Sequence, residues 1–219
     1  MCNAQNTRGP KRASRFVHRA LCLRPAITVQ CRHTTLSQEG ELGNGITCPS
    51  FTGLVAHSDR RYNYSFFVPD GWHRRDLSRS GDDNGPVEHG VFYAPILDDE
   101  FTGFSAEGCD LGMTVTGDDL AVLKSGFLSG LRKMPNSTIE SQEADAIGTL
   151  ITMEARHTYR DGGVIRKRWV RLLYQGSIQV RLVAQGATVT AFDYWLPMFY
   201  ESMRTFRFGD WGSELTGEA

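Results

Sequence analysis

The sequence contains no run of about 20 apolar residues, so no segment is long and apolar enough to cross a bilayer as a helix. The most apolar part of its beginning, residues 20–31, is interrupted by Arg24 and Pro25. That stretch therefore lacks the unbroken apolar core of a secretory signal. We expect a soluble protein that is not exported through a recognisable signal.

Cysteine is scarce, and three of the five cysteines fall within the first 31 residues. No C-x-x-C pair occurs, which argues against a disulfide framework and against a zinc site. The sequence also has no H-E-x-x-H, H-x-x-x-H or G-x-S-x-G motif. We therefore predict no catalytic residues, no metal and no cofactor, which favours a non-enzymatic protein over an enzyme.

Acidic side chains are absent from residues 1–38, which carry seven basic ones. An Arg-rich, acid-free composition is typical of an organelle transit peptide. A disordered tail and translated sequence ahead of the true start fit the same composition. The compartment is therefore the cytoplasm, or an organelle stroma or matrix if the segment is a transit peptide.

The rest of the chain is acidic, because the remaining 17 Lys and Arg stand against 25 Asp and Glu, a formal charge of −8. Nucleic-acid phosphates demand a basic surface, so we expect no nucleic-acid partner. The length suits one domain with appendages. We predict a targeting-like or disordered segment over 1–50, a folded domain over 51–210 and a short tail over 211–219.

The stretch YNYSFFVPDGW predicts a strand followed by a turn. Alternation places four apolar side chains on one face of that strand: Tyr62, Tyr64, Phe66 and Val68. Pro69-Asp70-Gly71 supplies turn chemistry, and Trp72 is expected to anchor the chain on the core. Residues 76–89 are polar and rich in Gly and Pro, which indicates a mobile loop, and 90–95 a second strand.

Apolar spacings of three and four predict a helix over about 118–134, capped by Thr116 or Asp118. Three alternating segments then predict an antiparallel meander over 149–159, 164–174 and 177–186. A second helix follows, and we expect its regular part to begin near Leu196 so that Pro197 lies in the first turn. The order predicts an α+β domain, an antiparallel sheet flanked by helices.

The element order, a first strand ending F-x-x-P-x-x-W (Phe66, Pro69, Trp72) and a terminal helix ending S-x-x-x-F (Ser202, Phe206) resemble the PsbP family. That family includes photosystem extrinsic proteins, a Ran-binding import factor and uncharacterised bacterial relatives. The resemblance covers residues 54–208 and implies an α/β/α sandwich. It also implies a binding or assembly factor without catalysis, but it carries over no functional residue.

The segment VIRKRWVR clusters four cations on one predicted strand: Arg166, Lys167, Arg168 and Arg171. Alternation puts Arg166 and Arg168 on one face, and Lys167, Trp169 and Arg171 on the other. One interpretation is a docking site for an acidic protein partner. The other is that the long side chains lie over the sheet and pair with neighbouring carboxylates.

A second candidate is the acidic loop formed by Asp98, Asp99 and Glu100, joined by residues 82–84 if the two loops meet. Calcium needs about six or more oxygen ligands in a set geometry, and EF-hand spacing is absent, so a solvated acidic loop is favoured.

We therefore expect a binding or assembly module that docks a protein partner, with an unknown oligomeric state. The alternative is a ligand carrier or enzyme with a pocket between sheet and helix, lined by Tyr64, Tyr93, Tyr159, Tyr174 and Trp195.

Overall fold

The computed structural model describes residues 49, 51–79 and 88–209 of the 219. Two α-helices, one short 3-10 helix and ten strands follow one another as β1 (Leu54–Asp59), β2 (Tyr64–Pro69), β3 (His73–Arg79), β4 (Glu88–Ala94), β5 (Gly103–Asp110), η1 (the 3-10 helix, Gly117–Asp119), α1 (Leu120–Arg132), β6 (Thr138–Ile147), β7 (Leu150–Asp161), β8 (Val164–Gln175), β9 (Ile178–Gly186), α2 (Val189–Arg204) and β10 (Arg207–Phe208). The predicted end segments, 1–50 and 211–219, lie outside the described residues apart from Pro49.

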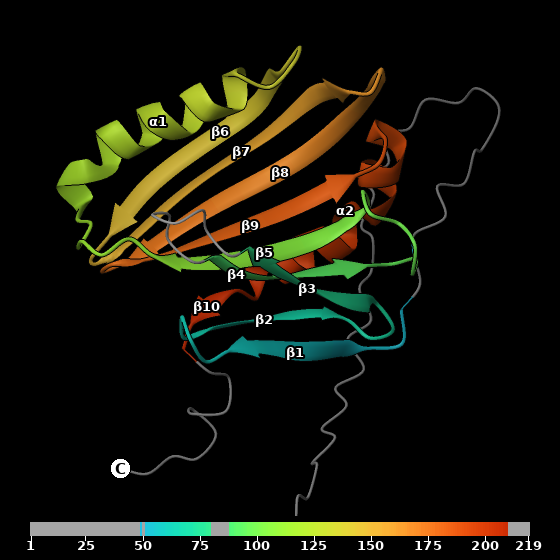
Figure 1. Ribbon diagram of the computed structural model, residues 1–219, viewed down its shortest axis with the longest axis horizontal. Helices are drawn as coiled ribbons and strands as arrows, with labels where there is room; N and C mark the ends of the chain where they lie inside the picture. Colours follow the sequence, from blue (N-terminus) through green and yellow to red (C-terminus); the bar gives the residue numbers. More distant parts are fainter. Residues whose placement is uncertain (1–48, 50, 80–87, 210–219) are drawn as a thin grey trace, which may run out of the picture.

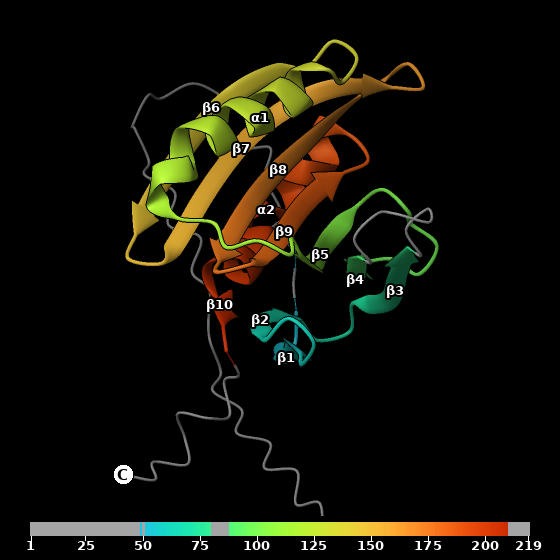
Figure 2. The same ribbon diagram turned by 60° about the vertical axis from the view of Figure 1, so that its left-hand side comes forward.

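The strands form two antiparallel sheets (Figure 1). The larger has seven strands in the order β3-β4-β5-β9-β8-β7-β6, and the smaller has the order β1-β2-β10. Helix α1 covers one face of the large sheet, over β6 and β7, while α2 covers the opposite face, over β9 and β8 (Figure 2). Helix α2 also packs on β2, so the small sheet joins the layer on the α2 side. The α+β sandwich predicted from the sequence is confirmed.

The first predicted strand is confirmed as β2. Tyr62, Tyr64, Phe66 and Val68 are all buried and belong to the main core. Gly71 adopts a φ of 88°, a left-handed conformation that glycine takes without strain. Trp72 is partly buried and meets the rings of Trp195 and Phe199 edge-on, so it anchors the turn on α2 as expected.

The main core lies between the large sheet, the small sheet and α2. It buries side chains from β2, β4, β5, β8, β9 and α2. The other face has two smaller clusters, in which α1 packs Leu120, Leu123, Phe127 and Leu131 onto β7 and β8. The first predicted helix is therefore confirmed. Asp119 accepts hydrogen bonds from the amide and hydroxyl groups of Thr116 at 2.9 and 3.2 Å and so closes the 3-10 turn (Gly117–Asp119) that leads into α1.

The predicted loop over 76–89 is wrong at both ends, because residues 76–79 belong to β3 and 88–89 to β4. These two strands pair in continuous register from His73 opposite Ala94 to Arg79 opposite Glu88. Pairing supplies the backbone hydrogen bonds that a polar local sequence does not reveal. Residues 80–87 lie outside the described part.

The predicted start of the second helix is also wrong, since α2 begins at Val189 and contains Pro197 in its interior. Thr188 caps it, accepting a hydrogen bond from the amide of Ala191 at 3.1 Å. Phe192 lies before the proline and Phe199 after it, and neither is exposed to solvent. Burial on both sides outweighs the roughly 3 kcal/mol that an interior proline costs a helix.

The predicted three-strand meander is confirmed as β7-β8-β9 and is extended on both sides. Strand β6 pairs with β7, and β5 pairs with β9. No helix of the described residues is long and apolar enough to span a membrane.

Candidate functional site

The four predicted cations lie on β8, and strand alternation distributes them as expected. Arg166 and Arg168 lie on the α1 side of the large sheet, where Arg168 contacts Tyr159 and Gln185. Lys167 and Arg171 lie on the α2 side, where they contact Asp193 and the carbonyl of Met203. The strand therefore carries two separate pairs of cations rather than one cluster.

Both cations on the α2 side are neutralised within the chain. The ammonium of Lys167 lies 3.2 Å from a carboxylate oxygen of Glu140 and 3.2 Å from one of Asp193. Burial opposes its charge, but hydrogen bonds to both carboxylates outweigh burial and raise the pKa of Lys167. The guanidinium of Arg171 lies 3.2 Å from Glu154 and donates to the carbonyl of Met203 at 3.1 Å.

Arg166 is buried against the β4–β5 loop. Its Nε lies 3.0 Å from Oδ2 of Asp161, and Nη1 donates to the carbonyl of Ala187 at 3.2 Å. Its guanidinium also stacks 3.8 Å from the centre of the Phe101 ring. Arg166 therefore joins the β7–β8 turn, the start of α2 and the β4–β5 loop.

Arg168 differs from the other three, because it pairs with no carboxylate among the described residues. It lies directly opposite His157 on β7 and Gln185 on β9. Nε donates to Oε1 of Gln185 at 2.7 Å, and Nη2 donates to the same oxygen and, at 2.8 Å, to the hydroxyl of Tyr159. Burial lowers the pKa of Arg168; Tyr159 and Asp161 act in the opposite direction, and the charges of Arg181 and Arg166 lower it further.

The partners of Arg168 are themselves held in place. Gln185 donates from Nε2 to the carbonyl of Phe101 at 2.8 Å, which turns its Oε1 toward the arginine. Tyr159 donates to that Oε1 at 2.9 Å, and its ring lies 4.7 Å from the guanidinium. We call Tyr159, Arg166, Arg168, Gln185 and Phe101 the arginine site.

The acidic loop lies beside the arginine site. Asp99 accepts hydrogen bonds from the amides of Phe101 and Thr102, both at 2.8 Å. Burial opposes its charge, but a hydrogen bond from the Thr102 side chain, the two amide hydrogen bonds and Arg166 lower the pKa of Asp99. Glu100 lies 3.6 Å from Arg75, and Asp98 is exposed. Asp99 therefore shapes the loop, and the described residues contain no group of three potential metal ligands. Asp82, Asp83 and Asn84 lie outside the described part.

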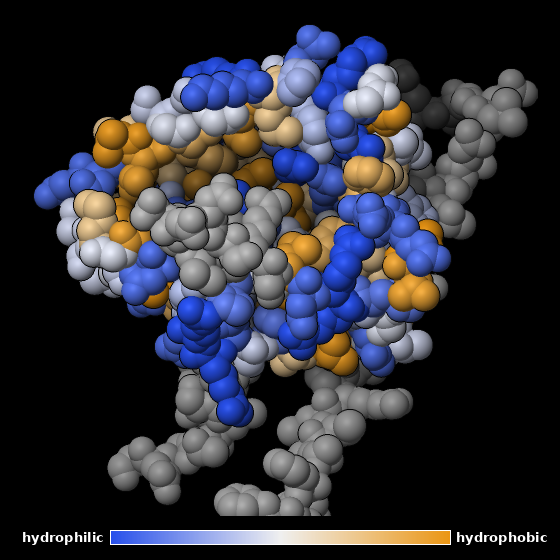
Figure 3. Space-filling model, in the orientation of Figure 1, coloured by the Kyte–Doolittle hydropathy of each residue, from blue (hydrophilic) through white to orange (hydrophobic). Residues whose placement is uncertain are grey.

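Exposed apolar side chains surround the arginine site. They come from the β4–β5 loop and the start of β8: Ile96, Leu97, Phe101 and Val164. Figure 3 shows apolar and hydrophilic residues interspersed at this end of the molecule, on the right. Aromatic side chains next to arginines are typical of the energetically important parts of protein interfaces, and the exposed aliphatic side chains add apolar surface that a partner can bury.

His157 is fully buried next to Arg168. Its Nδ1 lies 3.4 Å from Oγ of Ser137, and Nε2 has no hydrogen-bond partner among the described residues. Burial, followed by the charge of Arg168, lowers the pKa of His157 from 6.5 to about 4. The ring is therefore neutral at pH 7, which spares the site a further positive charge beside Arg166 and Arg168.

The lowered pKa of His157 predicts acid sensitivity. The unfolded chain takes up a proton near pH 6.5 and the folded one only near pH 4, so stability is lost as the pH falls between these values. Between pH 7 and pH 5, His157 should contribute a loss of about 2 kcal/mol in the free energy of unfolding. Urea unfolding of wild type and His157→Gln at both values would measure it. An NMR titration midpoint near 6.5 for the His157 ring would contradict the expectation.

The alternative pocket is not formed as predicted. Tyr64, Tyr93 and Trp195 belong to the main core on the α2 side of the large sheet. Tyr174 packs in an α1-side cluster, and Tyr159 joins Arg168 on the same side. Because the sheet separates these two groups, the five aromatic side chains line no common cavity.

Sequence reasoning named the arginines and Tyr159 but missed the roles of Gln185 and Phe101. Gln185 lies opposite Arg168 only because β9 follows β8 through a turn at Gly176, and nothing local marks a glutamine as an arginine partner. Phe101 reaches Arg166 from a loop 65 positions away in the chain.

Comparison with known proteins shows the fold and nothing finer. No protein-family model matches the chain, and no curated protein matches it. The solution structure of cyanobacterial PsbP (CyanoP) from Synechocystis sp. PCC 6803 is similar, with a TM-score of 0.50 and 15% identity over 77% of this chain and 98% of that one. This likeness confirms the PsbP-like fold predicted from the sequence.

Two further solved structures share less of the geometry. The Ran-binding protein Mog1p of Saccharomyces cerevisiae matches with a TM-score of 0.44 and 14% identity over 74% of this chain and 97% of that one. LpqN of Mycobacterium tuberculosis, described as involved in cell envelope biogenesis, has a TM-score of 0.41 and 13% identity over 63% and 92%.

Proposed function

We propose that this chain, which has the PsbP-like fold, is a non-enzymatic binding module that docks an acidic group of a protein partner at the arginine site. The observation that carries the proposal is the charge of Arg168, which has no carboxylate partner among the described residues. The resemblance to the PsbP family supports the proposal, because it implies binding or assembly factors.

A partly buried guanidinium without a counter-charge is energetically costly. Lys167, Arg171 and Arg166 each avoid this cost through a carboxylate within 3.2 Å. Arg168 instead uses Nε and Nη2 on the neutral oxygens of Gln185 and Tyr159, and its Nη1 donates to no described group. A carboxylate of a partner would supply both the missing charge and the missing acceptor.

The surroundings of Arg168 suit docking. Arg166 and Phe101 form a stacked pair at the edge of the site, and Leu97 and Ile96 are 67% and 62% exposed in the adjacent loop. Binding would bury these apolar side chains, while the charge of Arg168 would fix the orientation of the partner. Of the four predicted cations, the proposal therefore depends most on Arg168, with Arg166 in a supporting role. Lys167 and Arg171 would contribute least.

Photo-crosslinking tests the proposal. A benzoylphenylalanine at position 97 should form an adduct with a partner in an extract of native host cells, whereas one at the exposed Val122 on α1 should not. Arg168→Gln should reduce the yield of the adduct at position 97 by about tenfold or more, because it removes the charge that pairs with the partner. Raising the salt concentration should lower the yield of this adduct for the wild-type protein as well.

Arg60→Gln is the matched control, since it removes the same charge from the exposed turn after β1. The adduct yield of Arg60→Gln at position 97 should equal that of the wild type. Equal yields from folded Arg168→Gln and Arg60→Gln would contradict docking at the arginine site.

A further inference from the structure

Strand β6 is an outer strand of the large sheet. It is ten residues long and pairs with β7 on one side only. No other strand of the described residues pairs with its outer edge. A long, unpaired edge presents backbone N–H and C=O groups on which another chain can add as a further strand.

The pairing of β6 with β7 is regular over most of the length of β6. The register with β7 shifts between Ile139 and Ser141, and then runs without interruption from Ser141 opposite Arg156 to Ile147 opposite Leu150. The bulge that often disrupts an edge is therefore confined to one end. Residues 141–147 keep the geometry that strand addition needs.

The two faces of β6 differ in chemistry. Ala144 and Ala146 lie on the α1 side, where they pack in a cluster with Leu120 and Leu123. Glu143 and Asp145 alternate with them and lie on the other side of the sheet, and both are exposed. A strand added along the edge would meet small apolar side chains on one face and carboxylates on the other.

Glu140 of β6 pairs with Lys167, but the carboxylates of Glu143 and Asp145 have no cation beside them among the described residues. Glu143 lies directly opposite Glu154, whose carboxylate is already paired with Arg171 at 3.2 Å. Like charges in directly opposite positions destabilise a sheet. Neither Glu143 nor Asp145 has an ion pair within the described part of the chain. The edge therefore carries two unpaired acidic side chains two residues apart.

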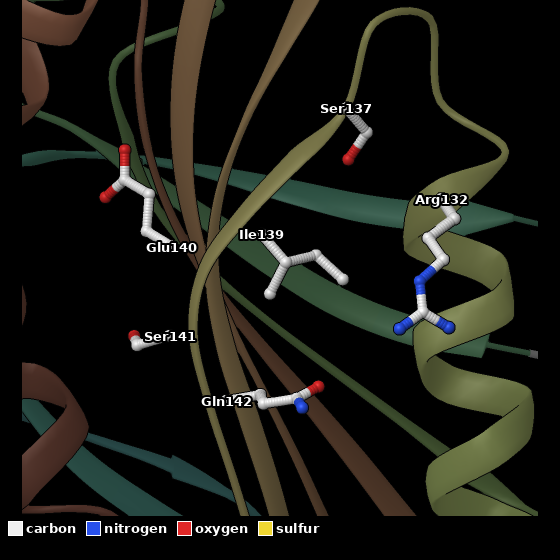
Figure 4. Close-up of a pocket in the computed structure, with 6 residues that line it drawn as sticks. All are labelled: Arg132, Ser137, Ile139, Glu140, Ser141 and Gln142. Carbon is white, nitrogen blue, oxygen red and sulfur yellow. The ribbon is translucent and has the colours of Figure 1, made fainter.

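A cavity of about 520 Å³ opens where the end of α1 meets the start of β6. Figure 4 shows Arg132 of α1 facing Ile139 and Gln142 of β6 across it, while Glu140 and Ser141 point to the other side of the strand. Ser137 completes the lining. A chain running along β6 could extend its polar end into this space.

We propose that the outer edge of β6 binds an extended segment of a protein partner that carries Lys or Arg at alternate positions. The segment adds as a strand beside residues 141–147. Its cations face Glu143 and Asp145, and its intervening small side chains lie on the α1 side. Acidic residues on an edge discourage neutral or acidic strands, so the same side chains admit a basic strand selectively. This inference does not depend on the arginine site.

Fluorescence anisotropy with synthetic peptides and the full chain tests the proposal. The probe is a labelled nine-residue peptide with Lys at every second position and Thr or Val between. A second peptide has Glu in place of each Lys. The wild-type protein should bind the Lys peptide at least about tenfold more tightly than the Glu peptide, because opposite charges in directly facing positions attract.

Charge reversal provides the sharpest outcome. The double variant Glu143→Lys, Asp145→Lys should no longer bind the Lys peptide and should bind the Glu peptide more tightly. The control variant Asp70→Lys, Asp98→Lys makes the same change in net charge on exposed loops away from β6, and should keep the wild-type preference. The same preference in both variants would overturn the proposal.

A backbone readout separates strand addition from loose charge attraction. Hydrogen exchange should slow over residues 141–147 when the Lys peptide binds, and a Lys peptide with alternate backbone nitrogens methylated should not bind. Equal binding of the methylated peptide would exclude strand addition. Without peptide, sedimentation could instead show dimers that form as the concentration rises, with slow hydrogen exchange over 141–147. That result would contradict the proposal, because the strand added to β6 would belong to a second copy of this chain.

Discussion

Replacing Gly186 with alanine should destabilise the protein by roughly 3 kcal/mol, at the upper end of the cost of overpacking. Gly186 ends β9 just before α2, and an added Cβ would lie 2.6 Å from both Cα of Phe192 and the carbonyl oxygen of Thr188. Both are backbone atoms of the first turn of α2, which a hydrogen bond from the amide of Phe192 to Thr188 holds at 3.0 Å. These backbone atoms can move away from the added Cβ only if the whole helix moves.

Urea unfolding of Gly186→Ala would measure this loss, and Gly126→Ala provides a matched control. Gly126 lies inside α1 with no atom near its added Cβ. Its replacement should therefore raise the free energy of unfolding by about 0.5 to 1 kcal/mol, the helix preference of alanine over glycine. A neutral effect of Gly186→Ala would mean that the β9–α2 corner is looser than the structure shows.

Replacing Phe199 with alanine should cost about 3 to 5 kcal/mol of stability, because a fully buried aromatic side chain leaves a large cavity. Phe199 has no exposed surface and lies on α2, where its ring packs against Phe192 at 5.5 Å and Trp72 at 6.0 Å between ring centres. It therefore joins the helix to the turn after β2. Thermal or urea unfolding would measure the loss.

The neighbouring Tyr200 is a matched control for Phe199. It is 50% exposed, so Tyr200→Ala should change stability by no more than about 1 kcal/mol. Similar losses for the two variants would show that α2 does not bury the face that contains Phe199.

Local patterns were reliable where one face of an element is buried. The alternation in β2 predicted Tyr64, Phe66 and Val68 on one face of the strand, and all three are at most 1% exposed. The three- and four-residue spacing of α1 likewise predicted its buried side. Burial of one face imposes the period of the element on the sequence, so the period can be recognised.

Local patterns failed where pairing or distant packing decides the structure. Strand β6 reads TIESQEADAI, and no side chain in it is fully buried, so its sequence has only a weak apolar period. Its strand form depends on hydrogen bonds to β7. Helix α2 runs through Pro197 because Phe192, Met198 and Phe199 are buried on the large sheet, which local propensity does not register.

The sequence by itself determined the acidic charge of residues 39–219, helix α1, the presence but not the start of helix α2, the meander and the division of the β8 cations between two faces. Each follows from composition or from a short-range period. Only the tertiary structure decided which of the β8 cations forms an ion pair with a carboxylate. Lys167 meets Asp193 across 26 positions and Arg166 meets Asp161 across a tight turn, whereas Arg168 meets Gln185 and Tyr159. Strand register and helix packing set these distances, and a charge interacts according to its position in space rather than its position in the chain.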